Sequence, residues 1–153
     1  MRSLYFVVFA TLLIVCNHVQ GQADKIGVNA KGKYVIVNDM RQLKSDWAEI
    51  LKGINVNEQL SLFQIVKKKD LVLNKYYYAL LASDNTNKIK CATFLVYKNN
   101  GFYVKKTAPA FVVTCTGESE SCIPNVLKGR WICGNTPNGK CTKDCTKTVS
   151  VSE

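Results

Sequence analysis

Histidine is almost absent from this chain of 153 residues. The single histidine, His18, lies in a segment that we expect to be removed, so the mature protein would contain none. Such a protein has no Ser-His-Asp or Cys-His catalysis, no histidine general base and no His-ligated zinc. The acidic residues Glu118 and Glu120 lie two apart in a turn-like stretch, with nothing else that marks a catalytic pair. We therefore predict that the chain is not an enzyme and that it uses no metal or other cofactor.

Arginine is scarce beside lysine once residues 1–21 are set aside. Only Arg41 and Arg130 then remain, whereas residues 22–114 hold 15 basic and seven acidic side chains, a net charge of +8. Because arginine makes the bidentate contacts that read phosphates and bases, we expect no specific binding of nucleic acid. Two interpretations of the lysines stay open. They attract an anionic lipid, polysaccharide or acidic protein, or they cover a solvated face of a sheet.

The first 21 residues have the pattern of a secretory signal peptide. Arg2 precedes an uncharged run, Leu4–Cys16, which as a helix would rise only about 20 Å, too little for a hydrocarbon core of ~30 Å. Val19 and Gly21 then stand at the −3 and −1 positions of a plausible cleavage site. We predict cleavage after Gly21, a secreted protein, and no transmembrane segment in the mature chain. An uncleaved membrane anchor is the alternative.

Cleavage would leave six of the seven cysteines, an even number that suits disulfides in an oxidising compartment. Five of them lie in a short tail, and only Cys141 and Cys145 have the spacing of one zinc-binding knuckle, so we favour disulfides over zinc. Six cysteines allow fifteen pairings. We predict a Cys91–Cys115 bond that docks the tail on the rest of the chain. The cysteines of the mature chain are Cys91, Cys115, Cys122, Cys133, Cys141 and Cys145.

Local signals predict one helix, over residues 39–52. Asp39 is a typical N-cap, Gln42 would complete a capping box, and Gly53 stands where a helix often ends. A short strand is expected before the helix, over residues 33–37. The apolar face of the helix consists of Met40, Leu43, Trp47, Ile50 and Leu51.

After the helix, runs rich in β-branched and aromatic residues predict consecutive strands separated by polar turns. The expected turns are residues 84–87 and the dipeptide Asn100-Gly101. The expected strands span residues 60–69, 75–83, 88–98 and 101–107, with a further one at 111–115.

These elements predict an α+β fold: one N-terminal helix packed on an antiparallel β-meander, followed by a disulfide-rich, irregular tail. We divide the chain into a signal peptide (1–21), an α+β domain (22–114) and a cysteine-rich segment (115–153) docked on that domain. Trp131 in the tail is interpreted as the cap of a small core. An exposed aromatic that binds a partner or a sugar is the alternative.

The run LSLFQIVKKKDLVLNKYYYALLASDNTNKIKCATFLVYKNNGFYVKK resembles the strand-and-hairpin portion of the cystatins in the order and spacing of its elements. The resemblance covers residues 33–107. It implies a sheet wrapped around the long helix and a protein that binds papain-like cysteine proteases. In the family, a Gln-x-Val-x-Gly hairpin and a Pro-Trp hairpin enter the protease cleft. Here only Val72 of those motifs is kept. The corresponding positions, our candidate binding residues, are Leu71, Val72, Leu73, Asn74 and Lys75, and then Lys98, Asn99, Asn100, Gly101 and Phe102.

Two functional hypotheses follow. The first is a secreted, disulfide-stabilised cystatin-like binding protein, in its sharpest form a divergent inhibitor of cysteine proteases. The alternative is a cationic secreted surface, host-defence or matrix protein that binds anionic lipid or polysaccharide.

Overall fold

A computed structural model of the chain describes residues 25–104, 110–135 and 144–152. The predicted signal peptide and Cys141 lie outside the described residues. The described part begins with a hairpin of two antiparallel strands, β1 (Lys25–Ala30) and β2 (Lys33–Ile36). Lys31 and Gly32 turn it, both with positive φ. The single strand that we expected before the helix is thus the second arm of a hairpin.

The predicted helix is confirmed as α1 (Met40–Lys52). The Asp39 carboxylate accepts the backbone N–H of Arg41 at 2.8 Å, which satisfies one of the free donors of the first turn. The predicted capping box does not form, because the Gln42 amide donates to the Asp46 carboxylate, one turn further along the helix.

Most of the predicted apolar face of α1 is confirmed. Leu43, Trp47 and Leu51 are buried, whereas Met40 in the first turn is exposed. Gly53 ends the helix in a right-handed conformation, and the left-handed position falls on Asn55, at φ 59°.

The meander that follows α1 has the predicted order. Every neighbouring pair in it is antiparallel, and the last two strands form a hairpin. Its two-residue turn is Asn99-Asn100, both with positive φ, and not the Asn100-Gly101 pair that we predicted. Gly101 instead opens the last strand, where the Tyr103 ring lies 2.8 Å from the place that a Cβ would occupy. The strands are β3 (Leu62–Lys69), β4 (Tyr76–Ser83), β5 (Ile89–Lys98) and β6 (Gly101–Val104).

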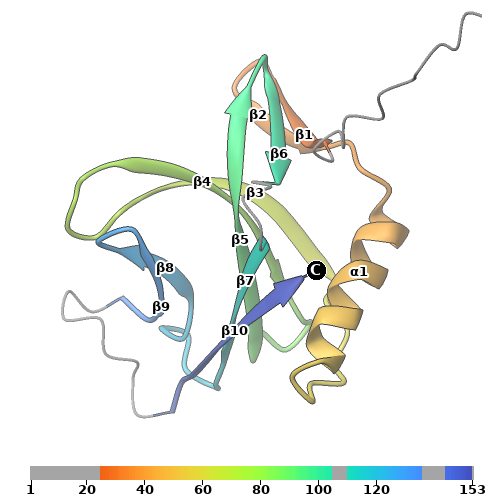
Figure 1. Cartoon of the computed structure of the whole chain (residues 1–153), viewed down its shortest axis with the longest axis vertical. Helices are drawn as coiled ribbons and strands as arrows, with labels where there is room; N and C mark the ends of the chain where they lie inside the picture. Colours follow the sequence, from red (N-terminus) through yellow and green to blue (C-terminus); the bar gives the residue numbers. More distant parts are fainter. Residues whose placement is uncertain (1–24, 105–109, 136–143, 153) are drawn as a thin grey trace, which may run out of the picture.

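We expected an irregular tail, but its described residues form regular strands, and the last of these joins the main sheet. The long β5 pairs with β4 along one edge, and along the other edge with β6 near its end and with β7 (Ala110–Thr116) near its start. β10 (Thr146–Ser152) pairs with β7, and β1 pairs with β6. The result is an eight-stranded, strongly bent and nearly barrel-like sheet (Figure 1). The expected domain boundary, between residues 114 and 115, falls within β7.

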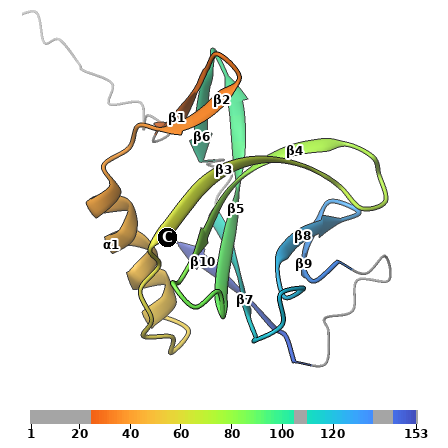
Figure 2. The same cartoon turned by 180° about the vertical axis from the view of Figure 1, so that it is seen from behind.

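The sheet is covered on both faces (Figure 2). On the helix face, Leu43, Trp47 and Leu51 of α1 belong to one core with residues of the sheet that include Leu80 and Phe102. The tail face, which carries the alternate residues of the same strands, packs against a separate hairpin of β8 (Pro124–Leu127) and β9 (Arg130–Cys133). The core of the tail face consists of Ala79, Ala92, Val113, Cys115, Cys122, Val126, Trp131, Cys133 and Cys145.

Candidate functional site

The connection between β3 and β4 is built around Asp70, a buried carboxylate that is 4% exposed. Its Oδ1 accepts the backbone N–H groups of Val72 at 2.9 Å and Leu73 at 2.8 Å. Across the molecule, the same carboxylate accepts the N–H groups of Lys128 at 3.1 Å and Gly129 at 2.7 Å, in the β8–β9 turn. Burial alone would raise the pKa of Asp70, but the four backbone donors lower it to about 2. One side chain thus ties the loop to the tail hairpin.

Two backbone hydrogen bonds complete this clamp. The Leu71 N–H donates to the Val126 carbonyl at 2.9 Å, and the Asp70 N–H donates to the Lys75 carbonyl at 2.9 Å. Asn74 takes a left-handed conformation, with φ 58°. The loop is therefore fixed at its base, and its backbone donors are largely satisfied within the molecule.

The clamped loop nevertheless exposes a run of aliphatic side chains. Leu71, Val72 and Leu73 are 36%, 42% and 48% exposed. Exposed apolar groups that lie together tend to mark interaction sites, and here three consecutive aliphatic residues are exposed on a fixed loop. The structure therefore presents these three predicted binding residues to solvent.

The surroundings of this loop are basic and aromatic. The Lys67 and Lys69 ammonium groups lie 4.6 Å and 5.6 Å from the centre of the exposed Tyr76 ring. Lys75 is exposed as well. Because Asp70 is buried, the charges that this part of the chain shows to solvent are positive.

The second predicted loop, at the β5–β6 turn, is held in a different way. The Asn100 side-chain amide donates to the Asn29 carbonyl at 2.9 Å and accepts the Tyr97 hydroxyl at 3.0 Å. Lys98, Asn99 and Asn100 are exposed.

Two residues of the second loop are not available for binding. Gly101 is buried, and Phe102, another of our candidate binding residues, is 0% exposed. Its ring packs between those of Tyr34, Tyr78 and Tyr97 because the pleat of β6 turns it into the core.

The structure does not bring the two predicted loops together into one wedge. The β5–β6 tip lies beside the tip of the β1–β2 hairpin, whereas the β3–β4 loop curves toward β8 and β9 (Figures 1 and 2). Leu71–Lys75 and Lys98–Asn100 therefore form separate surfaces, and only the first presents aliphatic side chains in a row.

The described part of the tail contains two disulfides, Cys115–Cys133 and Cys122–Cys145. The predicted Cys91–Cys115 bond is wrong, because these residues lie on opposite faces of the sheet. In the pairing of β5 with β7, Cys91 stands opposite Thr114, while Cys115 stands one position further along and faces the tail hairpin. Cys91 is buried in the helix-face core as a free thiol, and burial raises its pKa to about 11.

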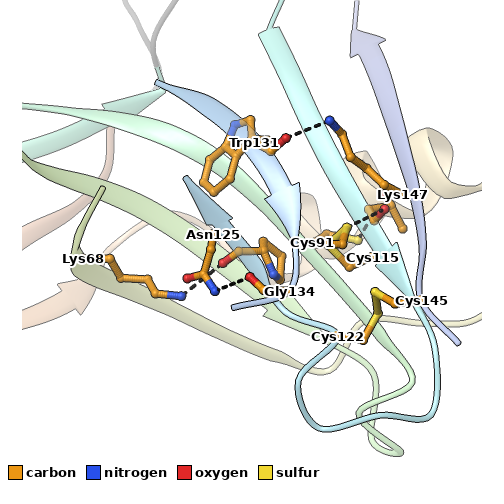
Figure 3. The surroundings of a disulfide bond; sticks show 12 residues. Lys68, Cys91, Cys115, Cys122, Asn125, Trp131, Gly134, Cys145 and Lys147 are labelled. Carbon is orange, nitrogen blue, oxygen red and sulfur yellow. Dashed lines mark hydrogen bonds between the residues drawn. A yellow bond between two sulfur atoms is a disulfide. The ribbon is translucent and has the colours of Figure 1, made fainter. Parts of the chain in front are cut away.

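Trp131 caps the tail-face core, as we predicted, and is not an exposed binding residue. It is 7% exposed, and its ring is stacked on that of Phe94 with 4.4 Å between the ring centres. The Lys147 ammonium donates to its carbonyl at 2.7 Å (Figure 3). Burial in the same core raises the pKa of Tyr77 to about 12.

The clamp on Asp70 was missed by sequence reasoning. An aspartate followed by a short turn was visible as a possible Asx turn, in which the side chain accepts the N–H groups two and three residues on. The other half of the clamp, at Lys128 and Gly129, is 58 and 59 residues away and left no local signal.

The described residues contain no cluster of three or more side chains suited to a metal ion. Within the same ranges, no helix is long and apolar enough to cross a membrane. Comparison with protein-family models, with curated proteins and with solved structures found no match. The functional argument therefore rests on the geometry of this chain.

Proposed function

We propose that this chain is a secreted, disulfide-stabilised binding protein that engages a protein partner through its β3–β4 loop. The observation that carries the proposal is the Asp70 clamp, which fixes the loop while Leu71, Val72 and Leu73 face solvent. A loop that is ordered before binding loses less entropy when it binds, so more of its contact energy appears as affinity. Aliphatic side chains at its tip suit the desolvated centre of a protein interface.

The partner that we favour is a papain-like cysteine protease. The helix and the antiparallel meander support a cystatin-like interpretation of the fold, and the β3–β4 connection corresponds to the inhibitory hairpin of that family. Because the motif residues are replaced and the β5–β6 tip points elsewhere, binding would depend on this loop alone. Two disulfides are compatible with an extracellular location, in line with the predicted signal peptide.

Inhibition of papain by the purified secreted protein tests this proposal. We expect inhibition at micromolar protein, and roughly tenfold weaker inhibition by Leu73→Ser, which removes an aliphatic contact. Val149→Ser is the matched control, because Val149 is 45% exposed on β10, away from the loop. Absence of inhibition by the unmodified protein would exclude a function as an inhibitor of papain-like proteases. Equal losses of inhibition in the two variants would exclude the β3–β4 loop as the binding surface.

A second candidate function is binding to an anionic membrane. It is favoured by the exposed Lys67, Lys69 and Lys75 around an aliphatic tip whose only carboxylate is buried. Each such lysine contributes about 1 kcal/mol near an anionic surface, and salt screens the attraction.

Sedimentation with phosphatidylserine vesicles would test the second candidate. We expect binding that falls steeply with added salt and that a triple change of Lys67, Lys69 and Lys75 to Gln removes. The control is a double change of the exposed Lys44 and Lys52 to Gln on α1. Binding that is insensitive to salt, or equal for phosphatidylcholine vesicles, would rule this function out.

A further inference from the structure

A groove of about 460 Å³ runs along the tail face of the sheet, apart from the loop discussed above. That volume is in the range of pockets that hold small molecules. Its walls come from β3, β4 and β5 on one side and from Ile123 and the start of β8 on the other. Its lining includes the aliphatic residues Leu62, Leu81, Ile123 and Pro124 and two lysines, Lys68 and Lys90.

The pleat of the sheet explains this lining. Leu62 and Lys68 lie on the same face of β3, because their separation is an even number of residues. Leu81 and Lys90 lie on that face of β4 and β5. The tail closes the groove at Lys68, whose ammonium donates to the Pro124 carbonyl at 3.1 Å, and Figure 3 shows this side chain reaching toward Asn125.

The lysines of the groove have no anionic partner in the described part of the chain. Its ion pairs are Arg41–Asp39 and Lys88–Glu118, both elsewhere, and no acidic residue lines the groove. An ammonium group has three donors, and for Lys68 the Pro124 carbonyl accounts for one. Burial lowers the pKa of Lys68 accordingly. A partly buried charge is normally paired, so this site has a place for an anion.

The aliphatic residues that line the groove indicate which kind of anion fits. Leu62 is 59% exposed at the groove, a large apolar area left to solvent. Inorganic phosphate or sulfate would use the lysines but would leave this wall uncovered. A molecule with a carboxylate at one end and an aliphatic body satisfies both parts of the groove.

We propose that the groove binds a small amphipathic carboxylate, with its carboxylate at the Lys68 ammonium and its aliphatic chain against Leu62, Leu81 and Ile123. Lys90 adds positive potential along the same groove. This site uses none of the residues of the β3–β4 loop, so it does not depend on the proposed protein partner.

Titration calorimetry with decanoate and decanol, below their aggregation limits, tests the charge requirement without any variant. We expect decanoate to bind roughly tenfold more tightly than decanol, because only decanoate carries a negative charge and can form an ion pair with the Lys68 ammonium. Decanoate should also shift the methyl NMR signals of Leu62, Leu81 and Ile123. Equal affinity for the two compounds, shifts elsewhere in the protein, or equally tight binding of inorganic phosphate would overturn the proposal.

Variants then assign the charge to a residue. Lys68→Met keeps the aliphatic stem and should weaken decanoate binding to the level of decanol, while Lys68→Arg should retain most of it. Lys67→Met is the matched control, since Lys67 points to the opposite face of β3, toward the Tyr76 and Tyr78 rings. Equal weakening by the control would contradict the assignment. If Lys68→Met does not fold, Lys90→Met and the comparison of decanoate with decanol still test whether the groove binds a carboxylate through its positive charge.

Discussion

The Cys115–Cys133 disulfide is expected to be a main source of the stability of the tail-face core. It joins β7 of the main sheet to β9 of the tail hairpin across 18 residues of sequence, with both cysteines fully buried. Closing a loop of that length removes conformational entropy from the unfolded chain worth about 3 kcal/mol at 25 °C. Since domains of this size are stable by only ~5–15 kcal/mol, loss of this bond should be plainly measurable.

Changing both cysteines to alanine is the suitable perturbation, because alanine leaves neither a free thiol nor a buried hydroxyl. We expect the free energy of unfolding in urea to fall by about 5 kcal/mol, of which about 3 come from loop closure and about 1 from each buried sulfur that is removed. The chain has two tryptophans, so a Trp47→Phe background leaves Trp131 as a fluorescent reporter inside the affected core. Cys91→Ala is the matched control, because it removes a buried sulfur without opening a loop and should cost only about 1 kcal/mol. A loss for the double variant no larger than twice that of the control would refute the loop-closure argument.

Two further predictions concern the tail hairpin and its clamp. Trp131→Ala should lower the free energy of unfolding by about 3–5 kcal/mol, because it removes the large ring that caps the tail-face core. Urea unfolding followed by circular dichroism would measure this loss, and a loss below about 1 kcal/mol would contradict the packing that we describe. The pKa of Asp70 is about 2 in the folded protein and 3.8 as its ordinary value, so its contribution to stability is fully present above pH 3.8 and is lost as the pH falls through 2. Asp70→Asn should therefore flatten the dependence of stability on pH over this acidic range, and an unchanged slope in acid unfolding would count against the clamp.

The features predicted correctly from the sequence are those with local signals. The helix over residues 40–52 follows from its apolar period and from Asp39 at its start. The strands of the meander follow from runs of apolar residues, and the order of these elements predicts their antiparallel pairing. The hairpin turn was placed one residue too late, because both Asn-Asn and Asn-Gly can adopt the positive φ values that such a turn needs.

The features that were missed depend on contacts distant in sequence. β10 pairs with β7 after an intervening hairpin, and no local pattern indicated that the tail would extend the main sheet. The disulfide pairing depends on which face of the sheet each cysteine occupies, which requires the register of β5 with β7. The candidate loop was located, but its clamp, and the groove beside Lys68, both need the tail hairpin in place.

Amide hydrogen exchange is the most direct test of the central claim, that Asp70 fixes the β3–β4 loop while its aliphatic residues remain exposed. We predict slow exchange of the Val72, Leu73, Lys128 and Gly129 amides in the native protein, and a joint increase of all four rates in Asp70→Asn. Exchange of Val72 and Leu73 at the rates of an unfolded chain in the native protein would contradict the claim.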